Sequence, residues 1–499
     1  MRFALILLLG LATPLFGFGQ AKDSIEYKIN QILEATQVPG AAVGVIYHDS
    51  IYFAKGFGFR NVSQKLPVDT QTIFPIGSCS KAFMATLLGW AQEKDLLNFI
   101  DAPSKYLHEL KFSNPNMDQN IQIRDLLAHS TGLPRHDLSW YLFPTEEGDS
   151  LTQRIAHLEP FAKVRERYHY NNFGYFLGGE LAEKVFQTSW ENALDSLLFT
   201  PLKMQRTHTD ILKIEDQNTS VGYASSLDAT AKPMAYYDLQ AMAPAGSICS
   251  SLEDMLQWTQ CWLNYGQKEG ETVIPTSYVQ EAISSQTIMR ANLPSEEEPN
   301  LFFSNYGYGW MLSSYKGIYR AEHGGNINGF SANVCFLPTE SLGIVVLTNQ
   351  NNSDATYIIR NMLIDFILNL NPSDWLGEYL AESEEEKTVT PVKTKKETSL
   401  RPLDDFIGAY RHPGYGAIKI FLKKNTLQAQ FPVGTFDLDN TDKLRFQLKA
   451  NTSSEIDPDT VPNLEFKFTS GPSENINGLT IPLEPMLDPI LFQRIKPKS

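Results

Sequence analysis

The sequence of 499 residues predicts an α+β domain, with one antiparallel sheet flanked by helices, followed by a small all-β, barrel-like domain. Strand-like runs stand at both ends of the first 375 residues, with helical runs between them. This order is typical of one sheet closed by strands that are distant in sequence. From about residue 403, short alternating runs are separated by Gly, Asn, Asp and Pro, which predicts a small barrel or sandwich.

The N-terminus has the layout of a secretory signal peptide. Residues 1–2 carry one positive charge, residues 3–11 form an apolar run, and small residues surround positions 17–20. The apolar run is too short to span a bilayer, and no later stretch is long and apolar enough. We therefore expect residues 1–20 to be cleaved and the mature protein to be secreted or periplasmic, without a transmembrane span.

Residues 21–375 form the predicted first domain. Its first element is a β-hairpin over residues 41–60, which turns at 48–50. Helices are then expected over 78–94, 124–130, 174–187 and 251–264, strands over 318–323, 330–337 and 343–349, and a last helix over 357–370.

Residues 376–402 predict a solvated linker, because they carry runs of both charges and almost no large apolar side chains. Residues 403–499 form the predicted β domain, which contains no residue set typical of catalysis.

Charge and composition restrict the partners. The net charge of -15 argues against nucleic acid, which requires clustered Lys and Arg, and favours a small-molecule or peptide substrate. The nine histidines show no metal-binding spacing, so we expect neither a metal nor another cofactor. Four cysteines without framework spacing predict four free, buried thiols, at Cys79, Cys249, Cys261 and Cys335.

Ser78 and Lys81 form a Ser-x-x-Lys where a loop meets a predicted helix. Positions i and i+3 lie one turn apart, so the Lys81 amine can take the proton of the Ser78 hydroxyl. The helix N-terminus favours developing negative charge, and burial would lower the pKa of Lys81. Taken alone, the pair is better explained as an N-cap serine and an exposed lysine. A second copy, from Ser313 to Lys316, has no helix to align it and is interpreted as a chance match.

Tyr170 and Asn172 belong to the chain's only Tyr-x-Asn, in a loop before the helix expected at 174–187. A phenol beside a serine and a lysine can relay a proton to the leaving group. A carboxamide can hydrogen-bond both the lysine and a substrate amide. A buried structural tyrosine is the alternative interpretation.

His323, Gly324 and Gly325 end one strand-like run and lead through Asn326 to the next. Glycines at this point allow a substrate backbone to approach the strand edge and leave an N–H free for an oxyanion hole. His-x-Gly is common by itself, and the copy at 412–414 is interpreted as a turn. Three weak motifs in this order make a strong prediction together.

This order of motifs resembles that of class C β-lactamases, DD-peptidases (penicillin-binding proteins) and related esterases and D-aminopeptidases. The resemblance covers about residues 25–370 and includes IRDLLAHSTGLP at 123–134, PLKMQRT at 201–207 and PAGSICSSLEDM at 244–255. The C-terminal segment resembles the lipocalin-like β domain of some peptidases in this superfamily, which implies a role in shaping the cleft or an oligomer.

The resemblance implies an exported serine hydrolase that acts through an acyl-enzyme. Ser78 would be the nucleophile, Lys81 the general base and Tyr170 the proton relay, while Asn172 would contact the substrate. The oxyanion hole would use the backbone N–H groups of Ser78 and Asn326.

One departure from the superfamily's pattern concerns the substrate strand, where His323, Gly324 and Gly325 would contact the substrate. β-Lactamases and DD-peptidases of this pattern carry a lysine where this chain has His323, which is mostly neutral at pH 7 and a poorer partner for a carboxylate. We therefore expect an ester or peptide substrate, D-amino-acid-containing peptides included, rather than a β-lactam. β-Lactamase or DD-carboxypeptidase activity is one alternative. A non-catalytic binder of cell-wall peptides, or a β-lactam sensor, is another. The oligomeric state stays open.

Overall fold

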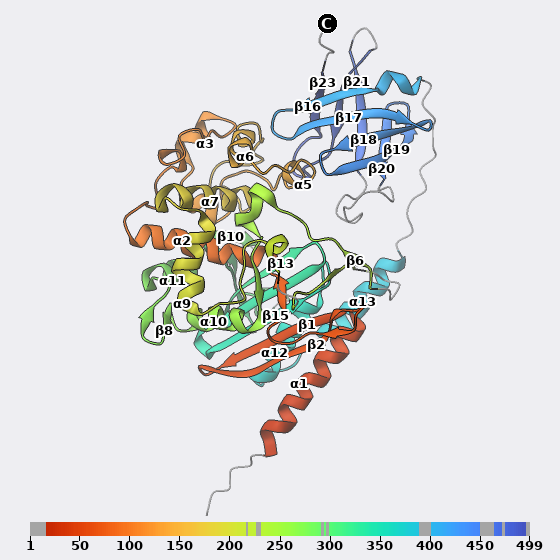
Figure 1. Ribbon diagram of the computed structural model, residues 1–499. Helices are drawn as coiled ribbons and strands as arrows, with labels where there is room; N and C mark the ends of the chain where they lie inside the picture. Colours follow the sequence, from red (N-terminus) through yellow and green to blue (C-terminus); the bar gives the residue numbers. More distant parts are fainter. Residues whose placement is uncertain are drawn as a thin grey trace, which may run out of the picture.

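The structure is a computed structural model of the chain. It describes residues 16–215, 218–225, 231–290, 294–295, 299–388, 401–449, 464–471 and 475–495. The chain forms a domain of helices around a large sheet and, near the C-terminus, a closed β-barrel (Figure 1). The predicted fold class is thereby confirmed.

The large sheet contains nine antiparallel strands. They are β1 (Gly40–Tyr47), β2 (Ser50–Asn61), β3 (Leu66–Pro67), β10 (Thr287–Arg290), β11 (Ser304–Tyr306), β12 (Met311–Tyr315), β13 (Ile318–Ile327), β14 (Phe330–Leu337) and β15 (Leu342–Thr348). Their order is β10-β11-β12-β13-β14-β15-β1-β2-β3. β1 pairs with β15, with Val45 opposite Ile344, so strands from the two ends of the domain close the sheet as predicted.

The predicted hairpin is formed by β1 and β2. It turns at His48 and Asp49, whose φ angles of 49° and 59° are both left-handed. Positive φ at both central residues defines a type I′ turn, whose twist matches that of the flanking strands.

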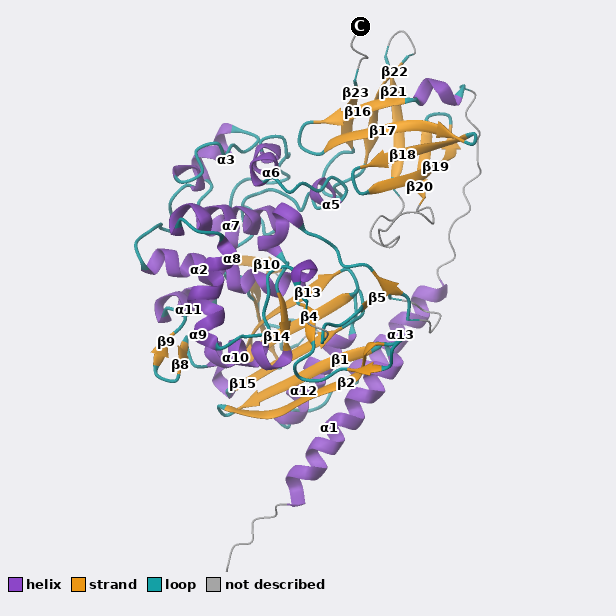
Figure 2. Ribbon diagram, viewed as in Figure 1, coloured by secondary structure: helices purple, strands orange, loops and turns teal. Residues whose placement is uncertain are grey.

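Helices cover both faces of the sheet (Figure 2). Val43 of β1 packs in one apolar cluster with α1 (Phe16–Ala35) and α12 (Ala355–Ile367), whereas Ala42 packs in another with α10 (Leu252–Leu263). Successive strand side chains point to opposite faces, and both of these are fully buried. Full burial of a valine side chain such as that of Val43 stabilises the fold by about 1.5–3 kcal/mol.

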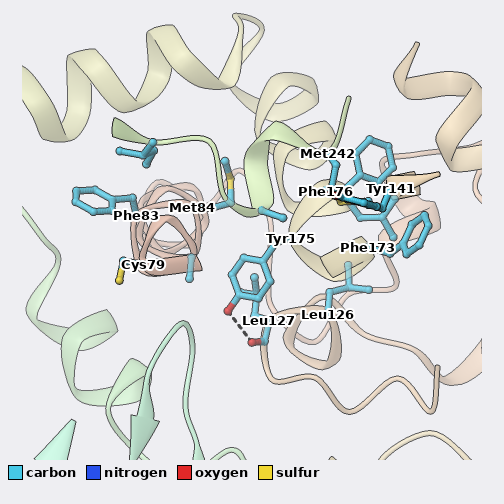
Figure 3. Packing of buried hydrophobic residues seen from close by; sticks show 14 of the residues in the cluster. Cys79, Phe83, Met84, Leu126, Leu127, Tyr141, Phe173, Tyr175, Phe176 and Met242 are labelled. Carbon is cyan, nitrogen blue, oxygen red and sulfur yellow. Dashed lines mark hydrogen bonds between the residues drawn. The ribbon is translucent and has the colours of Figure 1, made fainter. Parts of the chain in front are cut away.

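The helical region beside the sheet is built on two helices, α2 (Ser80–Glu93) and α7 (Asn172–Phe186). Figure 3 shows the buried side chains between them, among them Met84 and Tyr175. The Tyr175 phenol donates to the carbonyl of Leu127 at 2.9 Å. The other helices are α3 (Pro115–Asn120), α4 (Ile123–Leu127), α5 (Leu138–Tyr141), α6 (Gly148–Ile155), α8 (Trp190–Leu194), α9 (Thr200–Leu202) and α11 (Thr276–Ala282).

The predicted helix ends lie within three residues of the observed ones. α7 begins at Asn172 because the Asn171 side chain accepts a hydrogen bond from Gly174 N and caps the helix. α4 is shorter than the predicted 124–130, because His129 has a left-handed φ of 57° and cannot continue the helix. The predicted strand at 318–323 extends further, to Ile327.

The predicted linker begins inside a helix. α13 (Trp375–Thr388) occupies its first part, and the Trp375 indole donates to Asp365 Oδ2 at 3.3 Å. This charged segment favours a helix because Glu, Lys, Leu and Ala are good helix formers. Residues 389–400 lie outside the described residues.

The second domain is a closed barrel of eight strands in chain order. They are β16 (Gly408–His412), β17 (Gly416–Lys423), β18 (Thr426–Phe431), β19 (Gly434–Asp442), β20 (Arg445–Lys449), β21 (Glu465–Ser470), β22 (Ile476–Ile481) and β23 (Ile490–Arg494). β16 pairs with β23 and closes the barrel. His412-Pro413-Gly414 lies where β16 turns into β17, as predicted.

Most of the predicted signal peptide lies outside the described residues, except residues 16–20, which begin α1. Cleavage of residues 1–20 therefore stays a prediction. Within the described ranges, no helix has the length and apolar character that a membrane span requires.

Candidate active site

The candidate nucleophile lies in a tight turn that leads into α2. Gly77–Cys79 form a 3-10 turn, and the α-helix continues from Ser80. The Ser80 hydroxyl donates to the Gly77 carbonyl at 2.7 Å and accepts from Ile248 N at 3.1 Å. The turn thereby holds Ser78 at the helix N-terminus, where it lines a cavity of about 350 Å³.

Lys81 lies beside Ser78 on the same side of this turn. Its Nζ donates to Ser78 Oγ at 3.1 Å and to the carbonyl of Ala245 at 2.7 Å, and the side chain is fully buried. Burial lowers the pKa of Lys81 well below its usual range, and the charge of Arg135 lowers it further, while Asp137 opposes the shift. A lowered pKa favours the neutral amine, the form that can accept a proton.

Tyr170 packs its ring against the Lys81 amine and the Arg135 guanidinium. Lys81 Nζ lies 4.8 Å and the Arg135 guanidinium carbon 4.9 Å from the ring centroid. Its phenol oxygen is buried and makes no hydrogen bond of ordinary geometry within the described part of the chain. Burial raises the pKa of Tyr170 well above its usual range, while the neighbouring Ser78 hydroxyl lowers it in part. The phenol is therefore protonated at neutral pH and has hydrogen-bonding capacity to spare.

β13 crosses the nucleophile turn at very close range. A Cβ placed on Gly325 would lie 1.9 Å from the Ile76 carbonyl oxygen and 3.1 Å from Ser78 N. A Cβ on Gly77 would lie 2.7 Å from Asn326 N. Glycine at both positions therefore brings the amides of Ser78 and Asn326 to the same small region.

The two glycines after His323 differ in their surroundings. Sequence reasoning expected both to give a substrate room to approach, but Gly325 makes room for the protein's own nucleophile turn. At Gly324 a Cβ would meet no heavy atom closer than 3.9 Å, and this residue lines a second cavity, of about 670 Å³, that also reaches Ser78.

His323 is not placed to contact a substrate through its ring. The side chain is 1% exposed, its Nε2 lies 2.9 Å from the Tyr306 hydroxyl and its Nδ1 lies 2.6 Å from the Gly324 carbonyl oxygen. Burial and the nearby Lys81 lower the pKa of His323 to about 3. The imidazole is therefore neutral, as the sequence predicted, but it is also bonded on both nitrogens, and the sequence did not predict these partners.

Asn172 also differs from expectation. It was expected to hydrogen-bond the lysine, but its Nδ2 donates to Asp137 Oδ1 at 2.8 Å, and Lys81 bonds instead to Ser78 and Ala245. Asn172 still lines the cavity of Ser78.

Sequence reasoning missed Arg135 and Asp137, which line the same cavity as Ser78. Arg135 Nε donates to Asp137 Oδ2 at 2.6 Å. The sequence did contain a signal for these two residues. They lie within three positions of the Gly-Leu-Pro that ends the family-like segment 123–134, and loops held by a rigid scaffold often carry functional residues.

The second Ser-x-x-Lys is structural, as predicted. Ser313 lies in β12, and Lys316 follows at the turn into β13 with a left-handed φ of 48°. The Lys316 amine forms an ion pair with the buried Asp365 at 2.8 Å.

All four cysteines are free and buried, as predicted. Among the described residues, no group of three or more His, Cys, Asp or Glu is placed to hold a metal ion.

The fold and the site geometry define a β-lactamase/transpeptidase-like protein with a C-terminal barrel. The family model Beta-lactamase matches residues 25–369, and the chain belongs to this family. A second model, a domain of unknown function (DUF3471), matches residues 392–494, which include the barrel.

The chain is similar to the unguisins hydrolase ungD of Aspergillus violaceofuscus (strain CBS 115571), with 25% identity over 452 residues, covering 82% of this chain and 77% of the relative. It is also similar to protein flp of Staphylococcus aureus (strain MW2), with 25% identity over 348 residues, covering 68% and 66%. Among solved structures, the octameric penicillin-binding protein homologue from Pyrococcus abyssi has a TM-score of 0.63 and 18% identity, covering 95% of this chain and 100% of that one. This last likeness concerns the fold alone.

Proposed function

We propose that this protein is a serine hydrolase that forms an acyl-enzyme on Ser78. The observation that carries the proposal is the contact of 3.1 Å between Lys81 Nζ and Ser78 Oγ, made by a lysine that is fully buried. Burial without an ion-pair partner among the described residues favours the neutral amine, which is the form that a general base requires.

In the first half-reaction, Ser78 Oγ attacks the carbonyl carbon of an ester or amide, and Lys81 takes the hydroxyl proton. Tyr170 donates a proton to the leaving group, since its phenol is protonated and lies beside the Ser78 hydroxyl. In the second half-reaction, water attacks the acyl-enzyme and the proton transfers run in reverse, which releases the acid and restores the hydroxyl.

Negative charge develops on the carbonyl oxygen in both steps. The backbone N–H groups of Ser78 and Asn326 form the oxyanion hole in this proposal, because β13 brings them together at the start of α2. The N-terminus of α2 adds its dipole to this stabilisation.

The substrates proposed are esters and peptides, D-amino-acid-containing peptides included, and a relative named as a hydrolase supports hydrolysis. The aromatic side of the cavity favours an apolar group beside the reacting carbonyl: Tyr141 and Tyr237 stack with centroids 4.6 Å apart, next to Trp140. β-Lactam hydrolysis, slow acylation by a β-lactam, and pure binding are the alternatives that the experiment below distinguishes.

We also propose export of the protein, with cleavage after residues 1–20, from the charged start and the apolar run at the N-terminus. Mass determination of the protein secreted by its host would test this. A mass that includes residues 1–20 would contradict it.

The test of the site is intact-protein mass spectrometry after brief exposure to a fluorophosphonate and, separately, to a penicillin. We expect one fluorophosphonate adduct on the wild type and none on Ser78→Ala. Ser313→Ala is the matched control, because it removes the serine of the second Ser-x-x-Lys, and it should be labelled like the wild type. A wild type that neither reagent labels would contradict the proposal and favour a binding protein.

The lifetime of the penicillin adduct then separates the alternatives. Rapid loss of the adduct supports a hydrolase that also accepts β-lactams, whereas an adduct that persists supports a sensor. An activated Ser78 that reacts with the fluorophosphonate but not with penicillin supports an esterase or peptidase.

A further inference from the structure

His129 is a buried residue of the loop that follows α4. Its side chain is 2% exposed, and it is not among the described residues that line the two cavities at Ser78. A substrate in these cavities therefore does not touch the imidazole. Any influence of this histidine on the reaction has to pass through a neighbouring residue.

His129 holds the chain on both sides of Tyr170. Its backbone carbonyl accepts a hydrogen bond from His169 N at 3.0 Å, and its Nδ1 accepts one from Asn171 N at 3.1 Å. These two amides belong to the residues immediately before and after Tyr170. A single residue thereby fixes the backbone of the tyrosine at two points.

The imidazole also packs against the ring of Tyr170. The two ring centroids lie 4.4 Å apart with an interplanar angle of 40°, and the ring of Tyr306 lies 4.7 Å from the same imidazole. The Tyr170 phenol oxygen makes no hydrogen bond of ordinary geometry within the described part of the chain. Its position therefore depends on the packing of the ring and on the backbone, and His129 contacts both.

The backbone conformation and the protonation state of His129 suit this role. Its φ of 57° is left-handed, a conformation that histidine adopts more readily than most residues. Because Nδ1 accepts a hydrogen bond, the neutral ring carries its proton on Nε2. Burial lowers the pKa of His129 well below its usual range, so the Nδ1 acceptor persists at neutral pH.

We propose that His129 is a positioning residue that holds the Tyr170 phenol where it can protonate the leaving group. This inference rests on the proposed function and adds a residue that neither touches the substrate nor transfers a proton. The Nδ1 acceptor carries the role: without it the amide of the buried Asn171 loses its partner, which is costly, and the segment that bears Tyr170 shifts to satisfy it.

Two acetate esters that differ only in the leaving group test the proposal. p-Nitrophenolate leaves without a proton, whereas ethoxide has to be protonated as it leaves. Tyr170 is the proposed source of that proton, so its displacement should lower kcat/KM far more on ethyl acetate than on p-nitrophenyl acetate. A loss of folded protein would instead lower both values by the same factor.

His129→Gly and His129→Asn separate the acceptor from the rest of the side chain. Both new residues tolerate a left-handed φ, but only asparagine offers an oxygen, its Oδ1, near the position of Nδ1. We expect His129→Gly to lower kcat/KM on ethyl acetate by about 100-fold, the cost of a misplacement of 1 Å, and His129→Asn to restore most of this loss.

His412→Gly is the matched control. His412 is a histidine of the barrel whose Nδ1 also accepts a backbone hydrogen bond, from Gly414 N at 3.1 Å. The same substitution there removes the same kind of contact at a distance from Tyr170 in the sequence. It should keep the wild-type ratio of kcat/KM between the two esters.

A double-mutant cycle shows whether His129 acts through Tyr170. Tyr170→Phe already lacks the proton donor, so adding His129→Gly should lower kcat/KM on ethyl acetate little further, as expected of residues that act as a unit. Equal factors in the two backgrounds, or equal losses on the two esters, would overturn the inference, because they indicate a purely structural role.

His129→Asn keeps the inference falsifiable if His129→Gly does not fold. A folded His129→Asn with the leaving-group dependence of Tyr170→Phe would overturn it, whereas a wild-type ratio between the esters would support it. Fluorophosphonate labelling of Ser78 separates the two proposals. A wild type that is labelled and hydrolyses p-nitrophenyl acetate but not ethyl acetate would overturn the inference alone, while a wild type that is not labelled would contradict the proposed function.

Discussion

Gly325→Ala would add one methyl group where β13 crosses the nucleophile turn. The new Cβ would lie 1.9 Å from the Ile76 carbonyl oxygen, whereas real Cβ atoms essentially never approach closer than 3.0 Å. Strand and turn must therefore separate by at least 1.1 Å, the difference between these two distances. Both partners are backbone, so no rotamer change relieves the contact.

This separation displaces Asn326 N from Ser78 N and opens the proposed oxyanion hole. A misplacement of 1 Å costs about 100-fold in rate, and loss of one oxyanion donor costs about 100- to 1,000-fold. We therefore expect kcat on p-nitrophenyl acetate to fall by at least about 100-fold. Overpacking of this kind should also lower the free energy of unfolding by about 1–3 kcal/mol.

Gly324→Ala is the comparison, because it adds the same methyl group one residue earlier on the same strand. Its Cβ would meet no heavy atom within 3.9 Å, so we expect less than about a tenfold change in kcat, or under about 1.4 kcal/mol. Initial rates, thermal unfolding and the rate of fluorophosphonate labelling should be measured for both variants. Wild-type kcat in Gly325→Ala would refute the assignment of β13 to the oxyanion hole.

Three further predictions concern groups around Ser78 and beneath its cavity. Tyr170→Phe should lower kcat by about 100- to 10,000-fold, because it removes the proposed proton relay. It should not destabilise the fold, since the buried hydroxyl that it removes makes no hydrogen bond of ordinary geometry among the described residues. A melting temperature well below that of the wild type would contradict this. Because burial lowers the pKa of Lys81, kcat/KM should rise with pH through a pKa below 10.5, as the amine loses its proton. A profile in which kcat/KM is still rising near pH 10.5 would show that the lysine is unperturbed. His136→Ala breaks the hydrogen bond to Tyr415 and leaves buried polar groups unpaired, so the free energy of unfolding should fall by about 2–4 kcal/mol. The control is His108→Ala at an exposed position, which should stay within about 0.5 kcal/mol of the wild type. Equal melting temperatures of the two variants would contradict a stabilising role of His136.

The Ser78–Lys81 contact could be predicted from sequence because it depends on local geometry. Residues at i and i+3 lie on one side of a helical turn wherever that turn lies in the fold. The sheet was predictable for a similar reason: strand periodicity at 41–60, 330–337 and 343–349 is a local signal. The order of these runs also predicted a sheet closed by strands distant in sequence, and the pairing of β1 with β15 confirms it.

The surroundings of the site could not be predicted in the same way. The sequence predicted a neutral His323 but not its burial beside Tyr306, because burial depends on residues distant in sequence. Asn172 bonds to Asp137 rather than to Lys81, a choice of partner that no periodicity encodes. Arg135 was missed because a lone arginine in a loop is most often a solvated surface charge.

The loop of residues 135–137 connects the barrel with the candidate active site. Glu484 and Tyr415 of the barrel hold His136 from one side, while Arg135 and Asp137 on either side of it face the cavity of Ser78. His136 has a left-handed φ of 48°, so the chain turns at this residue and its side chain points to the barrel while the two flanking residues line the cavity. The described residues of the barrel that contact this loop bind His136, the residue next to the Arg135 guanidinium that lines the cavity. In the proposed function, the β domain therefore acts on the site through this loop, by holding His136 between two residues that line the cavity of Ser78.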